Sequence, residues 1–277
     1  MTDHDSSRTT ASWAGNPELD GSRPQSARIY DYLLGGKDNF APDRAVGDAL
    51  IAQVPALPVM VRAQREFLAR AVRHLVTECG IRQFLDLGTG IPAADNIHEV
   101  AQSLAPDARV LYVDNDPIVL SHARALMTST PEGAADFVQA DVRDPATLLA
   151  HPQLQATLDR ERPVALMLLG ILHHLRDDDD PNGLVATLVD WLPGGSYVTI
   201  AGPASDFDAE AMAAVAAAAE SSGVPYVARS REQTLRFVAG LELVAPGIVP
   251  IQDWRPDEPG APDVYGWAVM ARKPEAP

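Results

Sequence analysis

Residues 83–92 constrain the fold more than any other segment of this chain. They read Gln-Phe-Leu-Asp-Leu-Gly-Thr-Gly-Ile-Pro, an apolar strand that carries Asp86 near its end and turns through Gly88 and Gly90 into a helix. Because glycine has no Cβ, the backbone can turn sharply there and approach a ligand closely. A second apolar run ends at Asp114, 24 residues after Gly90, where a carboxylate can accept hydrogen bonds from both hydroxyls of a ribose. This pattern is typical of a crevice that binds a nucleoside.

Two nucleoside cofactors are compatible with the pattern. Gly88, Gly90 and Ala93 also satisfy the dinucleotide fingerprint, in which alanine can take the third glycine position. Asp86 favours S-adenosylmethionine, because a carboxylate at that point can bind the ammonium of a methionine moiety and would repel a pyrophosphate. A third apolar run ends at Asp141, whose side chain can accept a hydrogen bond from an adenine amino group. The sequence therefore favours S-adenosylmethionine over NAD(P). The remaining alternative is that the glycines only allow the chain to turn from strand to helix and bind no ligand.

The composition restricts the class of protein. With 277 residues and 46% hydrophobic content, the chain fits one large domain, or one domain with an appendage. The net charge of −16, from 38 acids and 22 bases, disfavours nucleic acid as a partner because phosphate binding needs a basic surface. No apolar run is long enough to span a membrane, the N-terminus lacks the apolar core of a secretory signal, and a single cysteine, Cys79, excludes an internal disulfide. We therefore expect a cytoplasmic protein without a membrane partner.

Lysine and histidine usage excludes two kinds of site. Lys37 and Lys273 are the only lysines, and neither has a tyrosine four residues upstream, so a dehydrogenase of the Tyr-x-x-x-Lys type is excluded. No pair of Cys or His residues has the spacing of metal ligands, so no metal site is expected. Lys37 lies in a Gly-Gly-Lys-Asp-Asn-Phe segment, where it is either a functional cation or a solvated loop residue.

The hydrophobic periodicity predicts an α/β fold. Residues 1–22 are polar and are expected to form a disordered tail, residues 23–80 an N-terminal helical part, and residues 81–277 the ligand-binding domain. Helices are expected at 26–34, 42–54, 59–78, 93–104, 117–128, 145–159, 182–192, 208–222 and 231–239, and strands at 82–87, 109–113, 135–140, 163–169, 196–201, 241–249 and 264–272. This alternation implies a mostly parallel, seven-stranded sheet with helices on both faces, and the last two strands suggest an antiparallel hairpin at one edge.

The segment Ser26–Phe40 resembles the opening signature of a bacterial S-adenosyl methyltransferase family that was long classed as a domain of unknown function. It reads Ser-Ala-Arg-Ile-Tyr-Asp-Tyr-Leu-Leu-Gly-Gly-Lys-Asp-Asn-Phe, and further similar segments lie at 81–90, 96–101, 112–117 and 240–244. The resemblance covers roughly residues 24–272. It implies a Rossmann-like class I methyltransferase fold with S-adenosylmethionine as cofactor, and it implies no particular substrate. The chain departs from the family pattern at Gln64, where asparagine is expected.

The resemblance also implies a set of cofactor contacts. The residues implied to line the methionine end are Asp86, Gly88, Thr89 and Gly90, and those implied at the ribose and adenine are Asp114, Asn115, Asp141 and Val142. As alternatives, Asn115 could be a turn residue and Val142 a core residue.

The N-terminal signature is expected to fold as a lid over the carboxyl ends of the strands, where ligands bind in such sheets. Its polar members are Arg28, Tyr30, Asp31, Lys37 and Asn39, of which all but Asp31 are expected to contact the cofactor. Arg28 or Lys37 could pair with the cofactor carboxylate, an interaction that arginine makes bidentately. The alternative is a helical appendage that only stabilises the fold.

The turn after the predicted fourth strand carries the candidate catalytic residues. Gly170 is expected beside the cofactor, and His173 and His174 follow it. A histidine there could act as a general base, which contributes about 10²–10⁴-fold to a rate. The alternative for either residue is a structural imidazole.

These observations predict a methyltransferase that uses S-adenosylmethionine and acts on an oxygen or nitrogen nucleophile of a small-molecule acceptor. The first alternative is a regulatory protein that binds the cofactor or S-adenosylhomocysteine without transferring a methyl group. The second is an oxidoreductase that binds NAD(P). A homo-oligomer is compatible with the sequence.

Overall fold

The computed structural model describes residues 20–258 and 264–275. The tail predicted over residues 1–22 lies, apart from its last residues, outside the described part of the chain. From residue 26 onward, three helices precede the first strand, and strands then alternate with helices as expected.

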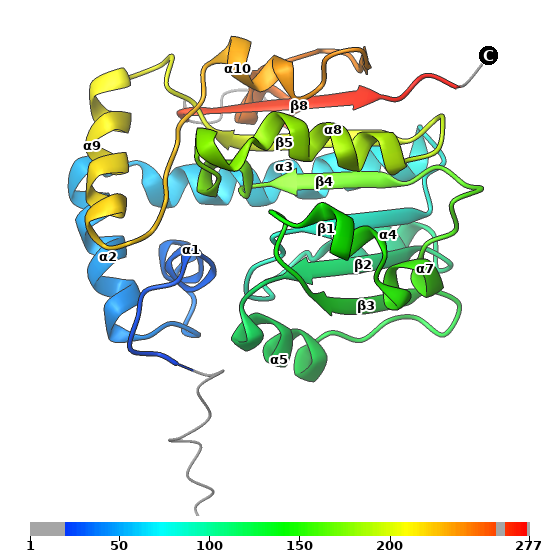
Figure 1. Cartoon of the computed structure of the whole chain (residues 1–277), viewed down its shortest axis with the longest axis horizontal. Helices are drawn as coiled ribbons and strands as arrows, with labels where there is room; N and C mark the ends of the chain where they lie inside the picture. Colours follow the sequence, from blue (N-terminus) through cyan, green and yellow to red (C-terminus); the bar gives the residue numbers. More distant parts are fainter. Residues whose placement is uncertain (1–19, 259–263, 276–277) are drawn as a thin grey trace, which may run out of the picture.

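One twisted sheet forms the centre of the molecule (Figure 1). Its strands run in the order β3-β2-β1-β4-β5-β8-β6, and β7 also pairs with β8. The principal strands are β1 (Gln83–Leu87), β2 (Arg109–Asp114), β3 (Ala134–Gln139), β4 (Ala165–Leu169), β5 (Tyr197–Pro203) and β8 (Gly266–Arg272). The strands from β3 to β5 are parallel to their neighbours, whereas β8 is antiparallel to β5. The carboxyl ends of β1, β2 and β4 therefore meet at one edge of the sheet.

Two predicted elements are broken by proline. The strand expected at 241–249 is instead two short strands, β6 (Glu242–Leu243) and β7 (Val249–Pro250), which both pair with β8 and are separated by a segment that contains Pro246. The helix expected at 145–159 is divided into α6 (Pro145–Leu149) and α7 (Pro152–Thr157). A proline lacks the backbone N–H that would continue a ladder or a helix, and it is well suited to the first position of a new helix.

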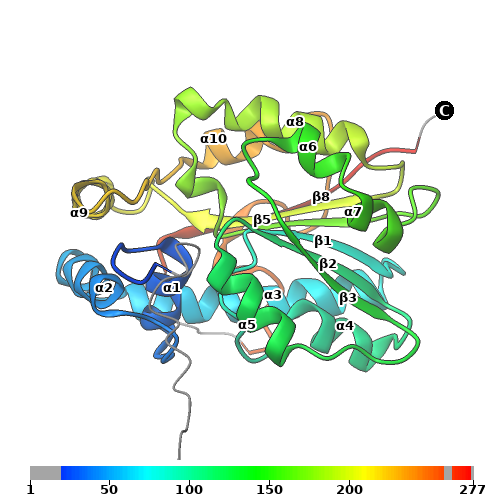
Figure 2. The ribbon, with the colours of Figure 1, turned by 60° about the horizontal axis from the view of Figure 1, so that its bottom comes forward.

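Helices cover both faces of the sheet (Figure 2). One face carries α3 (Leu57–Thr77), α4 (Ile97–Leu104) and α5 (Pro117–Leu126), and the other carries α6, α7, α8 (Pro181–Trp191) and α10 (Arg231–Arg236). Successive side chains of β1 alternate between the faces: Phe84 packs in the core that includes α3, and Leu85 and Leu87 pack in the core that includes α8. Burial on both sides accounts for the almost continuous apolar sequence of the central strands.

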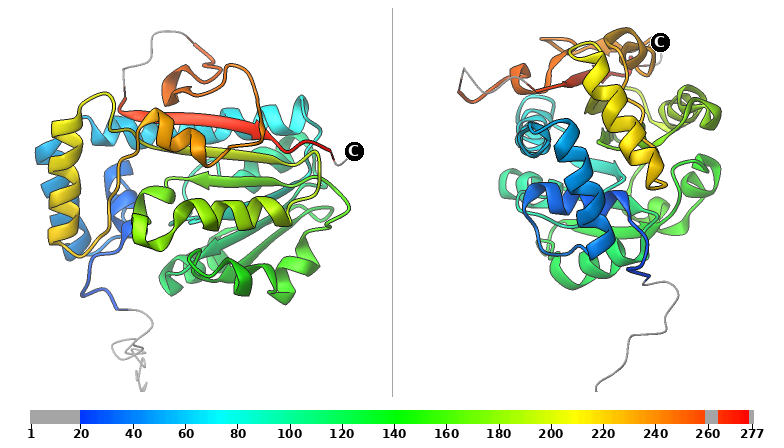
Figure 3. Two further views of the ribbon diagram at one scale, coloured as in Figure 1. Left: turned by 45° about the horizontal axis from the view of Figure 1, so that its top comes forward. Right: turned by 90° about the vertical axis from the view of Figure 1, so that its left-hand side faces the viewer.

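Three helices stand beyond the carboxyl ends of the parallel strands: α1 (Ser26–Leu34), α2 (Ala41–Gln53) and α9 (Ala209–Ser221) (Figures 1 and 3). Ile29 of α1 and Leu50 of α2 belong to the same hydrophobic core as Phe67 of α3 and Phe84 of β1. The N-terminal helices therefore share their core with the sheet. No single helix of the described segments is long and apolar enough to cross a bilayer, and α2 with α3 meets that test only as a pair bent by 102°.

Candidate functional site

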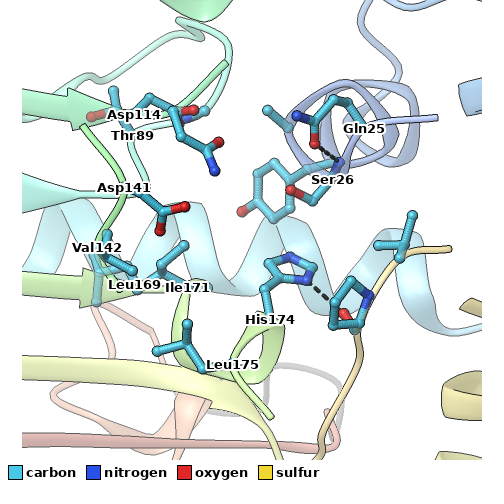
Figure 4. Close-up of a pocket in the computed structure, with 18 of the residues that line it drawn as sticks. Gln25, Ser26, Thr89, Asp114, Asp141, Val142, Leu169, Ile171, His174 and Leu175 are labelled. Carbon is cyan, nitrogen blue, oxygen red and sulfur yellow. Dashed lines mark hydrogen bonds between the residues drawn. The ribbon is translucent and has the colours of Figure 1, made fainter. Parts of the chain in front are cut away.

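A cavity of about 430 Å³ opens between α1 and the carboxyl ends of the parallel strands. Residues 24–30, α3, the turns after β1 to β4, and residues 223–225 form its walls, and we call it the polar cavity. Asp114 and Asp141 lie on the strand side and Gln25 and Ser26 on the helix side (Figure 4). The site predicted at the strand ends therefore coincides with a cavity.

The glycine turn after β1 brings the backbone close to the β4 side of the cavity. Gly88 has a φ of 73°, and a Cβ there would lie 2.6 Å from the side chain of Ile171. Asp114 is fixed against this turn, because its Oδ2 accepts a hydrogen bond from the Gly90 N–H at 2.9 Å and its Oδ1 accepts one from the Asp116 N–H at 2.9 Å. Each carboxylate oxygen has two lone pairs, so both can accept a further bond from a ligand hydroxyl.

Asp86 and Arg65 place opposite charges at one end of the polar cavity. Asp86 is 7% exposed, and burial raises the pKa of its carboxyl to about 7, against a smaller lowering by the Arg65 guanidinium. Arg65 donates from Nη2 to the Ala94 carbonyl at 2.6 Å, whereas its buried Nε has no hydrogen-bond partner among the described residues. The unpaired Arg65 donor could bind a ligand carboxylate, and the buried Asp86 carboxylate could bind a ligand ammonium. The pair therefore fits a ligand that carries both groups.

The end of β3 supplies Asp141 and Val142, and the end of β2 supplies Asn115, all of which line the polar cavity. Arg143 donates to Asp141 from its backbone N–H at 2.9 Å and from Nε at 2.9 Å. These hydrogen bonds to the Arg143 side chain hold the pKa of Asp141 below its usual value, so it is an ionised acceptor at the cavity wall. Arg143 also donates to Oδ2 from Nε at 3.1 Å and from Nη2 at 2.5 Å, so a ligand amino group at Asp141 would have to displace part of this ion pair.

Gly170 and Gln64 fit together at the end of β4. Gly170 has a φ of 72°, and a Cβ there would lie 2.5 Å from Nε2 of Gln64. Gln64 lines the polar cavity and a second, adjoining one. The glutamine that departs from the family pattern thus lies against a residue that leaves room for it.

The 3₁₀ helix η2 (Leu172–His174) carries both candidate catalytic histidines. His174 lines the polar cavity, and its Nδ1 lies 2.8 Å from the Pro225 carbonyl (Figure 4). Because a carbonyl oxygen can only accept, Nδ1 carries the proton, and Nε2 keeps its lone pair. Burial lowers the pKa of His174 below its usual value, so the ring is neutral near pH 7.

His173 does not line the polar cavity. Its ring centroid lies 3.9 Å from that of His174, and its buried Nδ1 has no partner within the described chain. Burial lowers the pKa of His173 well below its usual value. Arg229 holds the turn in place by donating to the carbonyls of Leu172 at 2.6 Å and Leu175 at 2.9 Å.

A second cavity of about 80 Å³ adjoins the first, and we call it the apolar cavity. Its walls come from α1, α2, α3, η2, the end of β5, Ala219 at the end of α9, and the segments around Tyr226, Ile251 and Tyr265. The two cavities share Ser26, Tyr30, Gln64, His174 and Val224. The Tyr30 hydroxyl donates to the Val61 carbonyl at 3.2 Å, and burial raises the pKa of Tyr30 to about 12. Tyr30 is therefore a neutral residue at the junction.

Three residues predicted to contact the cofactor lie outside both cavities. Arg28 is buried and forms ion pairs with Asp43 at 3.0 Å and Asp116 at 3.1 Å. Lys37 is exposed, and Asn39 donates to Asp31 at 2.8 Å. Arg28 and Lys37 therefore do not line the polar cavity, whereas Arg65, Arg143 and Arg176 do.

Sequence reasoning missed Arg65, Gln25 and Ser26, which the fold brings to the polar cavity. A signal for Arg65 was present: it lies one helical turn from both Val61 and Leu68, on the apolar side of α3. A charged residue on a buried helix face needs a partner, which makes it a candidate for ligand binding. No comparable signal marks Gln25 and Ser26. Among the described residues, no group of three His, Cys, Asp or Glu side chains could hold a metal ion.

Comparison with known proteins adds three findings. The family described as S-adenosyl methyltransferase matches residues 12–274. A DUF574 family protein from Streptomyces avermitilis MA-4680 is 46% identical with a TM-score of 0.88, covering 92% of this chain and 99% of its own. A Thermobifida fusca YX protein, described provisionally as a methyltransferase, is 44% identical with a TM-score of 0.85, covering 93% and 98%.

A more distant likeness concerns the fold alone. Human N-acetylserotonin methyltransferase, solved in complex with SAM, is 16% identical with a TM-score of 0.51, covering 92% of this chain and 64% of its own. This likeness confirms the predicted class of fold. No curated protein matches the chain.

Proposed function

The chain belongs to the S-adenosyl methyltransferase family, and from that premise we propose that it transfers the methyl group of S-adenosylmethionine to an oxygen or nitrogen atom of a small molecule. The observation that carries this proposal is the junction of the two cavities at His174. One cavity has charged groups suited to a nucleoside and an amino-acid moiety, and the other is apolar. A donor and an acceptor can therefore meet beside a neutral imidazole.

The residues of the polar cavity fit the proposed cofactor group by group. Asp114 would accept from the ribose hydroxyls, and Asp141 from the adenine amino group. Asp86 would bind the ammonium of the methionine moiety, and Arg65, with its orphaned Nε, the carboxylate. Pairing of this kind supplies the compensation that a buried charge needs.

When bound, S-adenosylmethionine supplies a methyl group on a sulfonium, which is already a good leaving system. The chain then mainly has to hold two reactants in line and exclude water, and such positioning can supply about 7–11 kcal/mol of a barrier reduction. The α1 side of the cavity, through Gln25, Ser26 and Tyr30, would act as the lid. His174 would accept the proton of the acceptor at Nε2, which its bond to Pro225 leaves free.

Calorimetric titration with S-adenosylhomocysteine tests the cofactor site. We expect binding in the micromolar range, and a loss of about 100-fold or more in Asp114→Ala or Arg65→Met, because each removes a charged hydrogen-bonding group. Asp190→Ala is the matched control, since Asp190 is an exposed acid on α8. NAD(P)H is titrated in parallel. Binding of NAD(P)H alone would overturn the proposal in favour of an oxidoreductase.

A further inference from the structure

We propose that the methyl acceptor is an uncharged, single-ring phenol, which places one edge of its ring in the apolar cavity and its hydroxyl at His174. This inference rests on the proposed function and names the substrate class for the same site. It is carried by the chemistry of the apolar cavity, by its size, and by the tautomer of His174.

The apolar cavity has no group that could neutralise a charged ligand. Among the described residues that line it, none is Asp, Glu, Lys or Arg. Its wall is mostly aliphatic, with Leu33, Leu57, Met60 and Ile251 as examples. An ionised group buried there without a partner would be strongly disfavoured. All the ionic groups at the site lie on the polar cavity, so the two cavities separate a charged cofactor from a neutral acceptor.

The size of the apolar cavity limits the acceptor to one ring. A dry apolar cavity of about 150 Å³ binds a single benzene molecule. The volume here is about 80 Å³, so one ring can enter only in part. The rest of the ring, with its hydroxyl, would then lie at the junction beside His174 and Tyr30. A fused two-ring system would leave its second ring in the polar cavity, in the space proposed for the cofactor.

Aromatic and neutral polar groups at the wall suit a phenol. The ring of Tyr226 meets that of His173 edge to face at 4.9 Å, and both line the cavity. Aromatic ligands are bound well by such edges. The buried Nδ1 of His173, which has no partner in the described chain, can form one hydrogen bond with a neutral ring substituent.

The state of His174 favours oxygen over nitrogen as the acceptor atom. Nε2 has a free lone pair, because Nδ1–H donates to the Pro225 carbonyl. A phenol, whose pKa is near 10, needs such a base, whereas a neutral aromatic amine already has a free electron pair. The hydroxyl proton passes to Nε2 and the oxygen pair forms the new C–O bond. The pair of the broken S–C bond remains on sulfur, and the imidazolium later loses its proton to water.

The test measures acceptor binding to the full-length protein saturated with S-adenosylhomocysteine. By calorimetry we expect 4-ethylphenol to bind at least about 100-fold more tightly than 4-hydroxyphenylacetate or tyramine, because each of these would bury a charge. We also expect 2-naphthol to bind at least tenfold more weakly than 4-ethylphenol. Equal or tighter binding of the charged compounds, or of 2-naphthol, overturns the inference, as does an absence of 4-ethylphenol binding at millimolar concentration. If S-adenosylhomocysteine itself does not bind, the result contradicts the proposed function and not only the choice of acceptor.

Methyl transfer and cavity variants complete the test. With S-adenosylmethionine, mass spectrometry should detect the methyl ether of 4-ethylphenol, and methylation of 4-ethylaniline alone overturns the choice of oxygen. Met60→Ala enlarges the apolar cavity and should improve 2-naphthol binding at least tenfold, whereas Met212→Ala, at a buried methionine of α9 that lines neither cavity, should not. Ile251→Val is the milder second variant should Met60→Ala not fold. Equal effects at Met60 and Met212 contradict the placement of the ring.

Discussion

Asp86 is the residue whose ionisation should control cofactor affinity. Burial raises the pKa of its carboxyl to about 7 in the ligand-free protein, and binding of an ammonium requires the ionised form. The affinity for S-adenosylhomocysteine should therefore be full above pH 7 and fall as the pH drops below it, by up to about tenfold per pH unit. Calorimetry between pH 5.5 and 8.5 measures this. A dissociation constant that does not change over this range would contradict the role of Asp86.

The same burial predicts that Asp86→Asn stabilises the ligand-free protein. The folded-state pKa of about 7 lies above the unfolded value of about 3.9, so the ionised carboxylate destabilises the fold, and the effect grows as the pH rises towards 7. At pH 8 the variant should gain on the order of 1–4 kcal/mol in unfolding free energy, with a smaller gain at pH 6. Urea denaturation at both pH values measures it, with the exposed Asp190→Asn as control. A loss of stability at pH 8 would show that Asp86 is held by favourable contacts.

His174 should affect the rate without affecting cofactor binding. With an acceptor that the wild-type protein methylates, His174→Ala should lower kcat by about 10²–10⁴-fold, because the proton acceptor is lost. Its affinity for S-adenosylhomocysteine should change only a few-fold, and His173→Phe should lower kcat much less. Since burial lowers the pKa of His174, kcat at saturating cofactor should decline only below the usual imidazole range. An unchanged kcat in His174→Ala would mean that His174 is not a general base and that the protein accelerates the reaction by positioning the reactants alone.

Which cations line the polar cavity could not be predicted from local sequence. Arg28 and Lys37 stand in the family signature, whereas Arg65 lies in a long helix between apolar residues. Their roles depend on tertiary packing, because α1 turns Arg28 toward Asp43 and Asp116 and α3 brings Arg65 beside Asp86. The location of Asp86, Asp114 and Asp141 at the polar cavity was predictable, since a residue at the end of a parallel strand lies at the same edge of the sheet wherever the helices pack.

Arg28 joins three elements into one unit. Its guanidinium pairs with Asp43 of α2 and with Asp116, the N-cap of α5, and the Asp116 N–H in turn donates to Asp114. Arg28→Met would leave two buried carboxylates without their partner, and we expect a loss of about 3–5 kcal/mol in unfolding free energy together with weaker binding of S-adenosylhomocysteine. Urea denaturation and calorimetry measure the two effects. Arg73→Met, which breaks an exposed pair with Asp257, should cost less than about 1 kcal/mol. Equal losses in the two variants would argue against this linkage.

Most element boundaries followed the sequence where hydrophobic periodicity was uninterrupted. The helix predicted at 26–34 has those bounds, and the strands of the parallel sheet lie within one or two residues of the prediction. Two helices are shorter than predicted: the one expected at 93–104 begins at Ile97, and the one expected at 231–239 ends at Arg236. The larger misses are the two segments interrupted by Pro152 and Pro246. There the apolar pattern continues across a residue that cannot donate a backbone hydrogen bond, so periodicity alone merged two elements into one.

In the whole molecule, both cavities lie at the interface between the N-terminal helices and the sheet. The α1 segment lines both cavities through Ser26 and Tyr30, while its Ile29 and Leu33 belong to the shared core. Deletion of residues 1–40 should abolish cofactor binding, as expected of a lid. The same deletion also removes core residues, so it does not separate a lid from a structural support.

Hydrogen exchange of the intact chain makes that separation. If α1 closes on the cofactor, S-adenosylhomocysteine should slow amide exchange in residues 26–34 at least tenfold, because bound ligand stabilises the closed arrangement by mass action. Amides of α8, which contributes to neither cavity, should change much less. Asp114→Ala should abolish the difference at a ligand concentration that saturates the wild-type protein. Slower exchange around Asp114 with unchanged exchange in α1 would mean that the N-terminal helices support the fold and take no part in enclosing the cofactor.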